Sequence, residues 1–215
     1  MFYKDPRQIY RVSELDELPW LVHGFGTRIA EIPANLSTLK QIHSAACVLA
    51  AGRTGHLGQG DALLENTPGS LVAVKTADCV PILLADPRQR AVAAVHAGWR
   101  GTAGKIAKRA VEEMGRHFGT RASNLHAALG PAIGVCCYEV GPEVARHFGQ
   151  TGRARIDLTK ANRDQLMEMG LCPDRIYSSG LCTMCLPEQF HSYRRDREAA
   201  GRMYSFIGIR EEDER

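Results

Sequence analysis

Three strongly apolar segments in the middle of the chain constrain its fold more than any other feature. Residues 71–75, 80–85 and 91–96 are short runs rich in Val, Leu, Ile and Ala, and turn signals such as Asp86-Pro87 separate them. Runs of this length and composition are typical of buried strands. The sequence therefore predicts a β-sheet with these three segments at its centre.

Amphipathic helices and further β-prone segments surround this centre. Residues 101–118 place apolar side chains at i, i+3, i+4 and i+7, the pattern of a helix packed on a sheet. Pro142 suits the first turn of a short helix, and residues 159–169 predict another helix with Asp157 or Thr159 as its N-cap. The remaining predicted strands are residues 8–12, 20–25, 39–50 with a break at Ser44 and Ala45, 125–129, 190–194 and 203–209.

The order of these elements favours one mixed domain. No internal repeat, low-complexity tract or Pro/Gly/Ser-rich linker divides the 215 residues, and this length corresponds to one domain. Strands and helices interleave, but hairpin-like spacings also occur, which favours a mixed sheet over a purely parallel one. We therefore expect residues 1–215 to form a single domain of the α+β class, a layered sandwich with a mixed β-sheet flanked by helices.

Composition and charge exclude several classes of protein. With 44% hydrophobic and 24% charged residues, the chain resembles an average soluble globular protein. Its apolar runs fall short of the roughly 20 residues that span a bilayer, and Asp, Glu and Pro interrupt the N-terminal region where a secretory signal would lie. The net charge of +3 is too small and dispersed to favour nucleic acid or a membrane surface. We expect a cytoplasmic monomer or homodimer in which any anion affinity is local.

Seven cysteines in such a chain favour reduced thiols, catalytic groups or metal ligands over disulfides. Cys182 and Cys185 form a C-x-x-C motif, but the chain has no second such pair at zinc-ribbon spacing. Cys136 and Cys137 are adjacent, and adjacent cysteines suit joint chelation of one metal poorly. We therefore expect these four to be buried or free thiols.

His43, Cys79 and His96 each lie near the end of a predicted element and together form a plausible zinc set. Three protein ligands with an open fourth position are typical of catalytic zinc, because the metal can lower the pKa of a bound water toward about 7. The same residues suit a second role, in which His96 activates the Cys79 thiol for nucleophilic attack and Asp61 or Asp78 orients the base. A bound metal would take up the thiolate, so one site cannot easily perform both roles.

Residues 98–105 form a glycine-rich segment that joins a predicted strand to a helix N-terminus, and we call it the anion loop. Free backbone N–H groups and the helix dipole favour an anion at such a position, and Arg100, Thr102 and Lys105 add donors. The segment resembles a Walker A loop, but its spacing is one residue too long and it lacks the Ser or Thr that binds magnesium. It therefore predicts a phosphate or carboxylate site, and Arg194 is a further candidate for substrate binding.

Seven groups of motifs together resemble a known family, the YfiH-type laccase-domain proteins, also called the multicopper polyphenol oxidase or peptidoglycan editing factor family. The resemblance covers nearly the whole chain, and Thr-Ala-Asp-Cys combined with His-Ala-Gly-Trp-Arg-Gly is highly specific. The motifs are Gly-Phe-Gly-Thr-Arg at 24–28, Gln-Ile-His at 41–43, Gly-Asp-Ala-Leu at 60–63, Thr-Ala-Asp-Cys at 76–79, His-Ala-Gly-Trp-Arg-Gly at 96–101, Leu-Gly-Pro-Ala-Ile-Gly at 129–134 with Cys-Tyr-Glu at 137–139, and Ser-Tyr-Arg-Arg at 192–195 with Gly-Arg at 201–202.

This resemblance implies a single-domain sandwich with a mixed sheet and a zinc ion, or Cu²⁺ in its place, at positions matching His43, Cys79 and His96. It also implies phosphorolysis of adenosine, inosine or methylthioadenosine to the base and ribose 1-phosphate, with adenosine deamination at the same site. Older family labels imply a copper-dependent polyphenol oxidase. The peptidoglycan-editing label is in keeping with an amide hydrolase that acts on a cell-wall precursor through Cys79 and His96.

Residue inventory helps to choose among these activities. A multicopper oxidase needs several coppers and clustered histidines, whereas this chain has eight histidines and no His-x-His pair. Phosphorolysis needs an anion site and deamination needs a metal-activated water, so we expect a zinc-dependent purine nucleoside phosphorylase with adenosine deaminase activity. Arg28 and Arg100 would hold phosphate, and Asp61 or Asp78 would handle the proton. One departure from the family is the short segment 29–40, which lacks the usual Gly-Gly-Val-Ser after Arg28.

Overall fold

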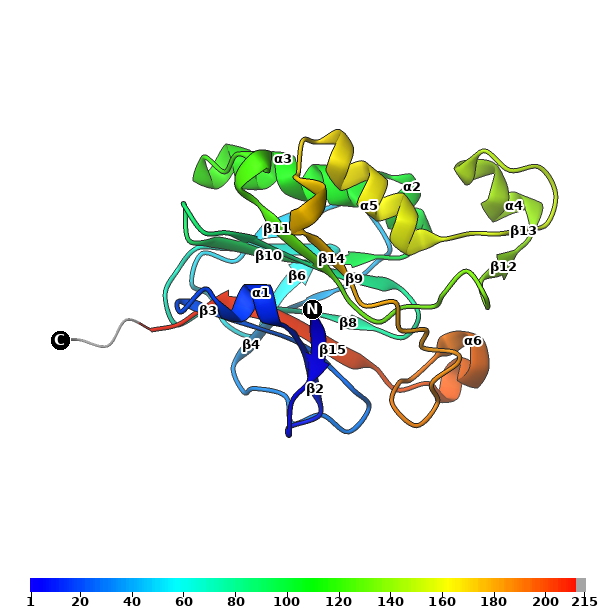
Figure 1. The fold of residues 1–215 in the computed structure, drawn as a ribbon, viewed down its shortest axis with the longest axis horizontal. Helices are drawn as coiled ribbons and strands as arrows, with labels where there is room; N and C mark the ends of the chain where they lie inside the picture. Colours follow the sequence, from blue (N-terminus) through cyan, green and yellow to red (C-terminus); the bar gives the residue numbers. More distant parts are fainter. Residues whose placement is uncertain (212–215) are drawn as a thin grey trace.

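Two β-sheets stack face to face in the computed structural model, which describes residues 1–211 (Figure 1). The six-stranded sheet contains, in spatial order, β14 (Ile176–Ser178), β11 (His126–Leu129), β9 (Val80–Asp86), β10 (Ala91–Ala97), β7 (Ala62–Glu65) and β5 (Cys47–Leu49). The seven-stranded sheet contains β1 (Phe2–Lys4), β2 (Ile9–Val12), β3 (Leu21–Gly26), β15 (Met203–Ile209), β8 (Leu71–Thr76), β4 (Leu36–Lys40) and β6 (His56–Gln59). Both sheets combine parallel and antiparallel pairs. The α+β sandwich is confirmed, with two mixed sheets where the sequence predicted one.

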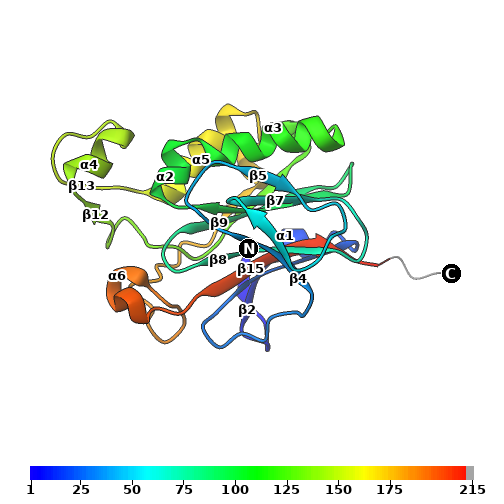
Figure 2. The same ribbon diagram turned by 180° about the vertical axis from the view of Figure 1, so that it is seen from behind.

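The longer helices cover only the outer face of the six-stranded sheet (Figures 1 and 2). They are α2 (Trp99–Ala103), α3 (Ile106–Phe118) and α5 (Leu158–Glu168). None of the helices described is long and apolar enough to cross a membrane. The peripheral elements are α1 (Ser13–Asp16), α4 (Pro142–Ala145), α6 (Tyr193–Asp196), the strand pair β12 (Glu139–Val140) and β13 (Ala154–Arg155), and the 3-10 turns Ala122–Asn124, Arg146–Phe148, Pro173–Arg175 and Arg197–Ala199.

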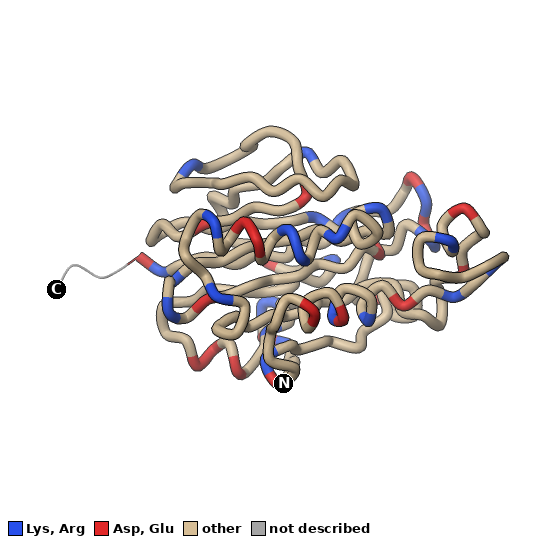
Figure 3. The backbone as a smooth tube through the Cα atoms, turned by 90° about the horizontal axis from the view of Figure 1, so that it is seen from above, with Lys and Arg blue, Asp and Glu red and all other residues tan. Residues whose placement is uncertain are grey.

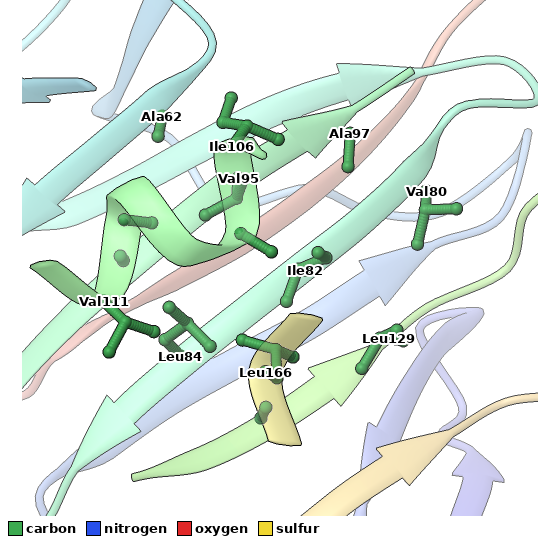
Figure 4. Close-up of a cluster of buried hydrophobic side chains, with 14 of the residues drawn as sticks. Ala62, Val80, Ile82, Leu84, Val95, Ala97, Ile106, Val111, Leu129 and Leu166 are labelled. Atoms are coloured by element: carbon green, nitrogen blue, oxygen red, sulfur yellow. The ribbon is translucent and has the colours of Figure 1, made fainter. Parts of the chain in front are cut away.

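The central strands are buried on both faces, as their continuous apolar composition predicts. Every residue of β9 and β10 is buried. Ile82 and Leu84 of β9 pack with the helices, whereas the intervening Leu83 packs in the second core between the sheets. Figure 4 shows Ile106 of α3 and Leu166 of α5 over the same strands. Each buried side chain of this kind contributes about 1.5–3 kcal/mol, so the two cores fix the strand registers.

Two predicted elements differ from the structure. The helix expected over 101–118 is divided into the end of α2 and the whole of α3, because Lys105 takes a left-handed conformation with φ of 61° between them. The strand expected at 190–194 is wrong, because the hydroxyl of Ser192 accepts a hydrogen bond from the Arg195 backbone N–H and caps α6. The Asp157 N-cap of α5 is confirmed by its hydrogen bond from the Lys160 backbone N–H.

One edge of the six-stranded sheet collects the loops that matter for function. β10 is antiparallel to β9 and to β7, so its end lies beside the starts of both strands, with His96 opposite Pro81. β11 is also antiparallel to β9, and β14 is parallel to β11, so both of these strands end at the same edge. β5 starts there because it is parallel to β7. In Figure 1 this edge faces β12 and α6.

Candidate functional site

Three side chains far apart in the sequence meet at this edge. His96 is the second-last residue of β10, Cys79 immediately precedes β9, and His43 lies in the loop between β4 and β5. One ligand atom of each lies within 4.8 Å of the others. The rings of His43 and His96 meet edge to face with their centroids 4.9 Å apart. The structure thus brings together the three residues that the sequence singled out, and we call them the His-Cys-His cluster.

The backbone around this cluster is unusually constrained. His43 and Asp78 have φ angles of 58° and 87°, in the region that favours glycine. At Gly98, an added Cβ would lie 2.9 Å from the Sγ of Cys79 and 3.2 Å from the Cδ2 of His43, so only glycine allows this approach. A backbone conformation of this kind costs on the order of 1–3 kcal/mol per residue and persists only where the surrounding structure enforces it.

Asp61 holds both histidines in place. Its carboxylate is fully buried at the start of β7 and accepts hydrogen bonds from Nδ1 of His96 at 2.9 Å and from the backbone N–H of His43 at 3.0 Å. The backbone N–H and hydroxyl of Ser44 donate to its other oxygen at 2.6 and 2.7 Å. With Nδ1 of His96 donating to Asp61, Nε2 of this ring is left for Cys79 or a metal. Asp61 is therefore placed to orient the cluster.

Electrostatics favour ionised groups in the cluster. Burial raises the pKa of Asp61, but the hydrogen bonds from His96 and Ser44 outweigh burial and hold it at about 2. Burial likewise raises the pKa of Cys79, but the charge of His96 and the hydrogen bond from His43 lower it to about 6. Burial lowers the pKa of His96, whereas the Cys79 thiolate and the Asp61 hydrogen bond raise it to about 9. One thiolate and two imidazoles are a donor set that fits Zn²⁺ and also copper.

A cavity of about 720 Å³ opens over the cluster. Its charged lining is mainly basic, and among the described residues none of the Lys and Arg side chains of this lining forms an ion pair. Elsewhere along the described residues, Lys and Arg are interspersed with Asp and Glu (Figure 3). The basic residues in the lining are Lys40, Lys75, Arg100, Arg194, Arg197 and Arg202, and the acidic ones are Asp78 and Glu198.

The predicted phosphate-binding residues divide into two groups. Arg100 and Arg194 line the cavity. Arg28 lies outside the cavity lining, and its Nη1 donates a hydrogen bond to the Pro187 carbonyl at 2.8 Å. Thr102 is buried behind the cavity, where its hydroxyl accepts from the amide of Asn162. The structure thus brings Arg100 and Arg194 to the cavity and leaves Arg28 and Thr102 outside its lining.

Asp78 lies in the cavity wall, but both of its oxygens are occupied. Oδ1 accepts from the hydroxyl of Thr183 at 2.6 Å, and Oδ2 accepts from the backbone N–H of Arg194 at 2.7 Å. Asp61 likewise accepts from five donors, which are three backbone N–H groups, the Ser44 hydroxyl and Nδ1 of His96. Each carboxylate is thus held by several hydrogen bonds, which suits it to position the neighbouring groups.

The sequence did not single out Tyr138, which lies in the Cys-Tyr-Glu motif and lines the cavity. Burial and the nearby Cys79 charge raise the pKa of its phenol to about 12, so the hydroxyl stays a hydrogen-bond donor. Within residues 1–211 this hydroxyl has no partner, while the Arg194 guanidinium lies over the ring at 5.2 Å. Arg197 and Arg202 were also missed, and only the Gly-Arg motif at 201–202 pointed to one of them.

Known proteins match both the sequence and the fold. Residues 26–210 match the family model described as multi-copper polyphenol oxidoreductase laccase. A purine nucleoside phosphorylase of Deinococcus radiodurans is 40% identical over 185 residues, which are 81% of this chain and 70% of that protein. Adenosine deaminase RL5 of an unknown prokaryotic organism is 42% identical over 163 residues, which are 69% of this chain and 61% of that protein. The crystal structure of the Bacillus licheniformis hypothetical protein YfiH matches with a TM-score of 0.89 and 27% identity, and covers 97% of this chain and 99% of that one.

Proposed function

Because the chain belongs to the multi-copper polyphenol oxidoreductase laccase family and shares its YfiH-type fold, we propose that it is a purine nucleoside phosphorylase that also deaminates adenosine. The substrates are adenosine, inosine and methylthioadenosine, which react with phosphate to give the base and ribose 1-phosphate. The names of the relatives support both activities. One observation carries the proposal: a single cavity combines the His-Cys-His cluster with unpaired basic side chains.

The basic side of the cavity suits phosphate. Arg100 and Arg194 are held in fixed positions by aromatic rings, since their guanidinium groups lie 4.3 Å from the Trp99 centroid and 5.2 Å from the Tyr138 centroid. A planar guanidinium can bind two phosphate oxygens at once, which orients the nucleophile toward C1′ of the ribose. Binding by preset groups lowers the entropic part of the barrier, and their charges stabilise the negative charge of the reacting phosphate.

The remaining lining suits a nucleoside. Ile133, Leu158 and Tyr138 supply apolar surface for a purine, and the cavity volume lies in the range of small-molecule sites. The unpaired Tyr138 hydroxyl donates a hydrogen bond to the purine as the bond from C1′ to the base breaks and the base gains electron density. Asp61 fixes the His96 ring throughout the reaction.

The residues present fit a metal ion at the His-Cys-His cluster. Held by these three residues, Zn²⁺ would supply Lewis-acid chemistry to the cavity. Multicopper oxidase chemistry has less support, because in the part of the chain that the structure describes only two of the eight histidines take part in a group of metal-ligating side chains.

A second candidate is an amide hydrolase on a cell-wall precursor. The arrangement of three side chains supports it. Asp61 accepts a hydrogen bond from His96, and His96 lies beside Cys79, as expected for an oriented base next to a thiol nucleophile. A covalent mechanism needs one base, however, whereas two imidazoles converge on the Cys79 sulfur. The second imidazole has a clear role only in metal binding.

Chromatography of adenosine incubated with and without phosphate tests the proposal directly. We expect adenine to form only with phosphate and inosine to form in either case. Chelator should stop both reactions, and zinc returned to the metal-free protein should restore them unless Cys79 has first been alkylated with iodoacetamide. The assignment would be overturned in favour of the amide hydrolase by either of two results. The metal-loaded protein could form neither product, or its activity could survive chelator and be lost on alkylation of Cys79.

A matched pair of arginine variants tests the phosphate side. Arg100→Lys should raise the KM for phosphate by about tenfold, because Lys cannot form the two-oxygen contact, and should leave the KM for the nucleoside within about twofold. Arg28→Lys is the control, since Arg28 lies outside the cavity, and both constants should stay unchanged. Equal changes in both KM values for Arg100→Lys would remove Arg100 from this role.

A further inference from the structure

Four cysteines, which the sequence predicted to be buried or free thiols, meet outside the cavity. Cys136 and Cys137 lie in the loop after β11, and Cys182 and Cys185 lie in the loop after β14. These loops are neighbours because β11 and β14 are parallel and end at the same edge, with Leu129 opposite Ser178. All four Sγ atoms lie within 4.8 Å of one another.

The spacing of the sulfur atoms matches a tetrahedral metal site. Sγ of Cys185 lies 3.4 Å from that of Cys137 and 3.7 Å from that of Cys136. Zinc–sulfur bonds of about 2.3 Å in a tetrahedron place sulfur atoms about 3.8 Å apart. The four cysteines are free thiols in the structure. The four Sγ atoms are therefore close enough to bind one metal ion without a large movement of the chain.

The backbone of both loops is built around this arrangement. The loops join in a short bridge between Ala132 and Cys182, where the Thr183 N–H donates to the Ala132 carbonyl at 3.0 Å. The Gly134 N–H donates to the Sγ of Cys182 at 3.2 Å, as expected for an amide that supports a thiolate ligand. An added Cβ at Gly134 would lie 3.1 Å from the Sγ of Cys136 and 3.3 Å from the Cβ of Cys182, so glycine keeps the pairs close.

We propose that Cys136, Cys137, Cys182 and Cys185 form a second metal centre, a closed four-thiolate site for Zn²⁺. Four thiolates in a tetrahedron select zinc or iron, and zinc needs no redox partner. With all four positions filled by protein, the ion has no open position for substrate. Its role is structural: it joins the loop after β11 to the loop after β14.

The joined loops form one wall of the cavity. The first loop carries Ile133 and Tyr138, which line it. The second loop carries Thr183, whose hydroxyl holds Asp78, the residue before the Cys79 ligand. Arg194 contacts the first loop as well, because its Nη1 donates to the carbonyls of Cys137 and Glu139. The four-cysteine site thus fixes the position of substrate-lining residues without touching the substrate.

Metal content of purified wild type and three variants tests the proposal. We expect about two zinc ions per chain in wild type and about one in Cys185→Ser. His43→Ala should also retain about one, held by the four cysteines. Cys172→Ser is the matched control, because Cys172 is an exposed cysteine outside both clusters, and it should retain about two. Equal zinc content in Cys185→Ser and wild type, or iron in place of zinc, would overturn the assignment.

Alkylation of the wild-type protein gives a test that does not depend on the folding of a variant. Cys136, Cys185 and Cys172 are all exposed, so accessibility alone would make them react alike with iodoacetamide. The proposal predicts that only Cys172 reacts in the metal-loaded protein and that all three react after zinc is removed with chelator. Equal labelling before chelation would overturn the proposal. The proposal would also be overturned if Cys136 and Cys185 stay protected from iodoacetamide after chelation and react only after a disulfide reductant is added, because that result indicates disulfides.

Discussion

The His-Cys-His cluster and the four-cysteine site lie at the same edge of the six-stranded sheet, yet they are built differently. The first has three ligand residues, lines the cavity and is oriented by the buried carboxylate of Asp61. The second has four, lies outside the cavity lining and is supported by the amide of Gly134. Three ligands leave a position for chemistry, whereas four close the site and leave the ion a structural role. Ligand number and position in the fold thus separate two functions.

The sharpest way to break this contrast is to remove a ligand from the open site. His96→Ala should lower both activities by on the order of 10³-fold or more, because the variant loses a ligand of the proposed catalytic metal ion. Metal analysis should show one zinc ion fewer, while the four-cysteine site keeps its own. Full activity in a His96→Ala protein that lacks this zinc would contradict the role of the cluster.

Removing the support of the open site should have a smaller effect. Asp61→Asn keeps the size of the side chain but weakens its hold on the His96 ring, so we expect zinc affinity and kcat to fall about 10–100-fold. Competition with a chromogenic chelator measures the affinity without reference to activity. Asp86→Asn is a matched control, since Asp86 is equally buried at the far end of β9 and accepts from the backbone of Arg88. Similar losses in both variants would indicate a general effect on the fold.

Tyr138 links the two regions, because it follows Cys137 in the chain and faces the cavity above the other cluster. Tyr138→Phe removes one hydrogen bond to the purine, worth about 0.5–1.5 kcal/mol, so kcat/KM should fall by about threefold to tenfold. Zinc content should not change at either site. A loss of zinc in Tyr138→Phe would show that the ring supports the metal sites, and an unchanged kcat/KM would exclude the hydroxyl from substrate recognition.

Local chemistry explains which parts of this molecule the sequence predicts well. The three central strands follow from apolar runs whose alternate side chains, such as Leu83 and Leu84, enter different cores. Asp157, one of two predicted N-caps with Thr159, is predictable because its side chain acts within one turn of its own backbone. The break at Lys105 and the cap at Ser192 are equally local, but a helical pattern and a β-prone run concealed them.

The site was harder to predict because it depends on contacts between distant segments. His43, Cys79 and His96 were predicted to form a metal site because each lies near the end of a predicted element, and the family resemblance strengthened this prediction. No spacing rule joins Cys137 to Cys185, since only the parallel pairing of β11 and β14 brings their loops together. Arg28 shows the opposite case, because its motif suggested a phosphate ligand while the fold places it outside the cavity lining.

The smallest expected effect on activity comes from the closed site, and it sharpens the contrast most. Cys185→Ser should raise the KM for the nucleoside by about twofold to fivefold, with kcat nearly unchanged, because Tyr138 and Ile133 lose a fixed position but the open cluster stays intact. The thermal midpoint should fall by roughly 4–10 °C, since a structural ion contributes folding free energy. Kinetics and thermal unfolding, with Cys172→Ser as control, measure both. A kcat that falls as far as in His96→Ala would mean that the four-cysteine site takes part in the reaction, and the division between an open and a closed site would then be wrong.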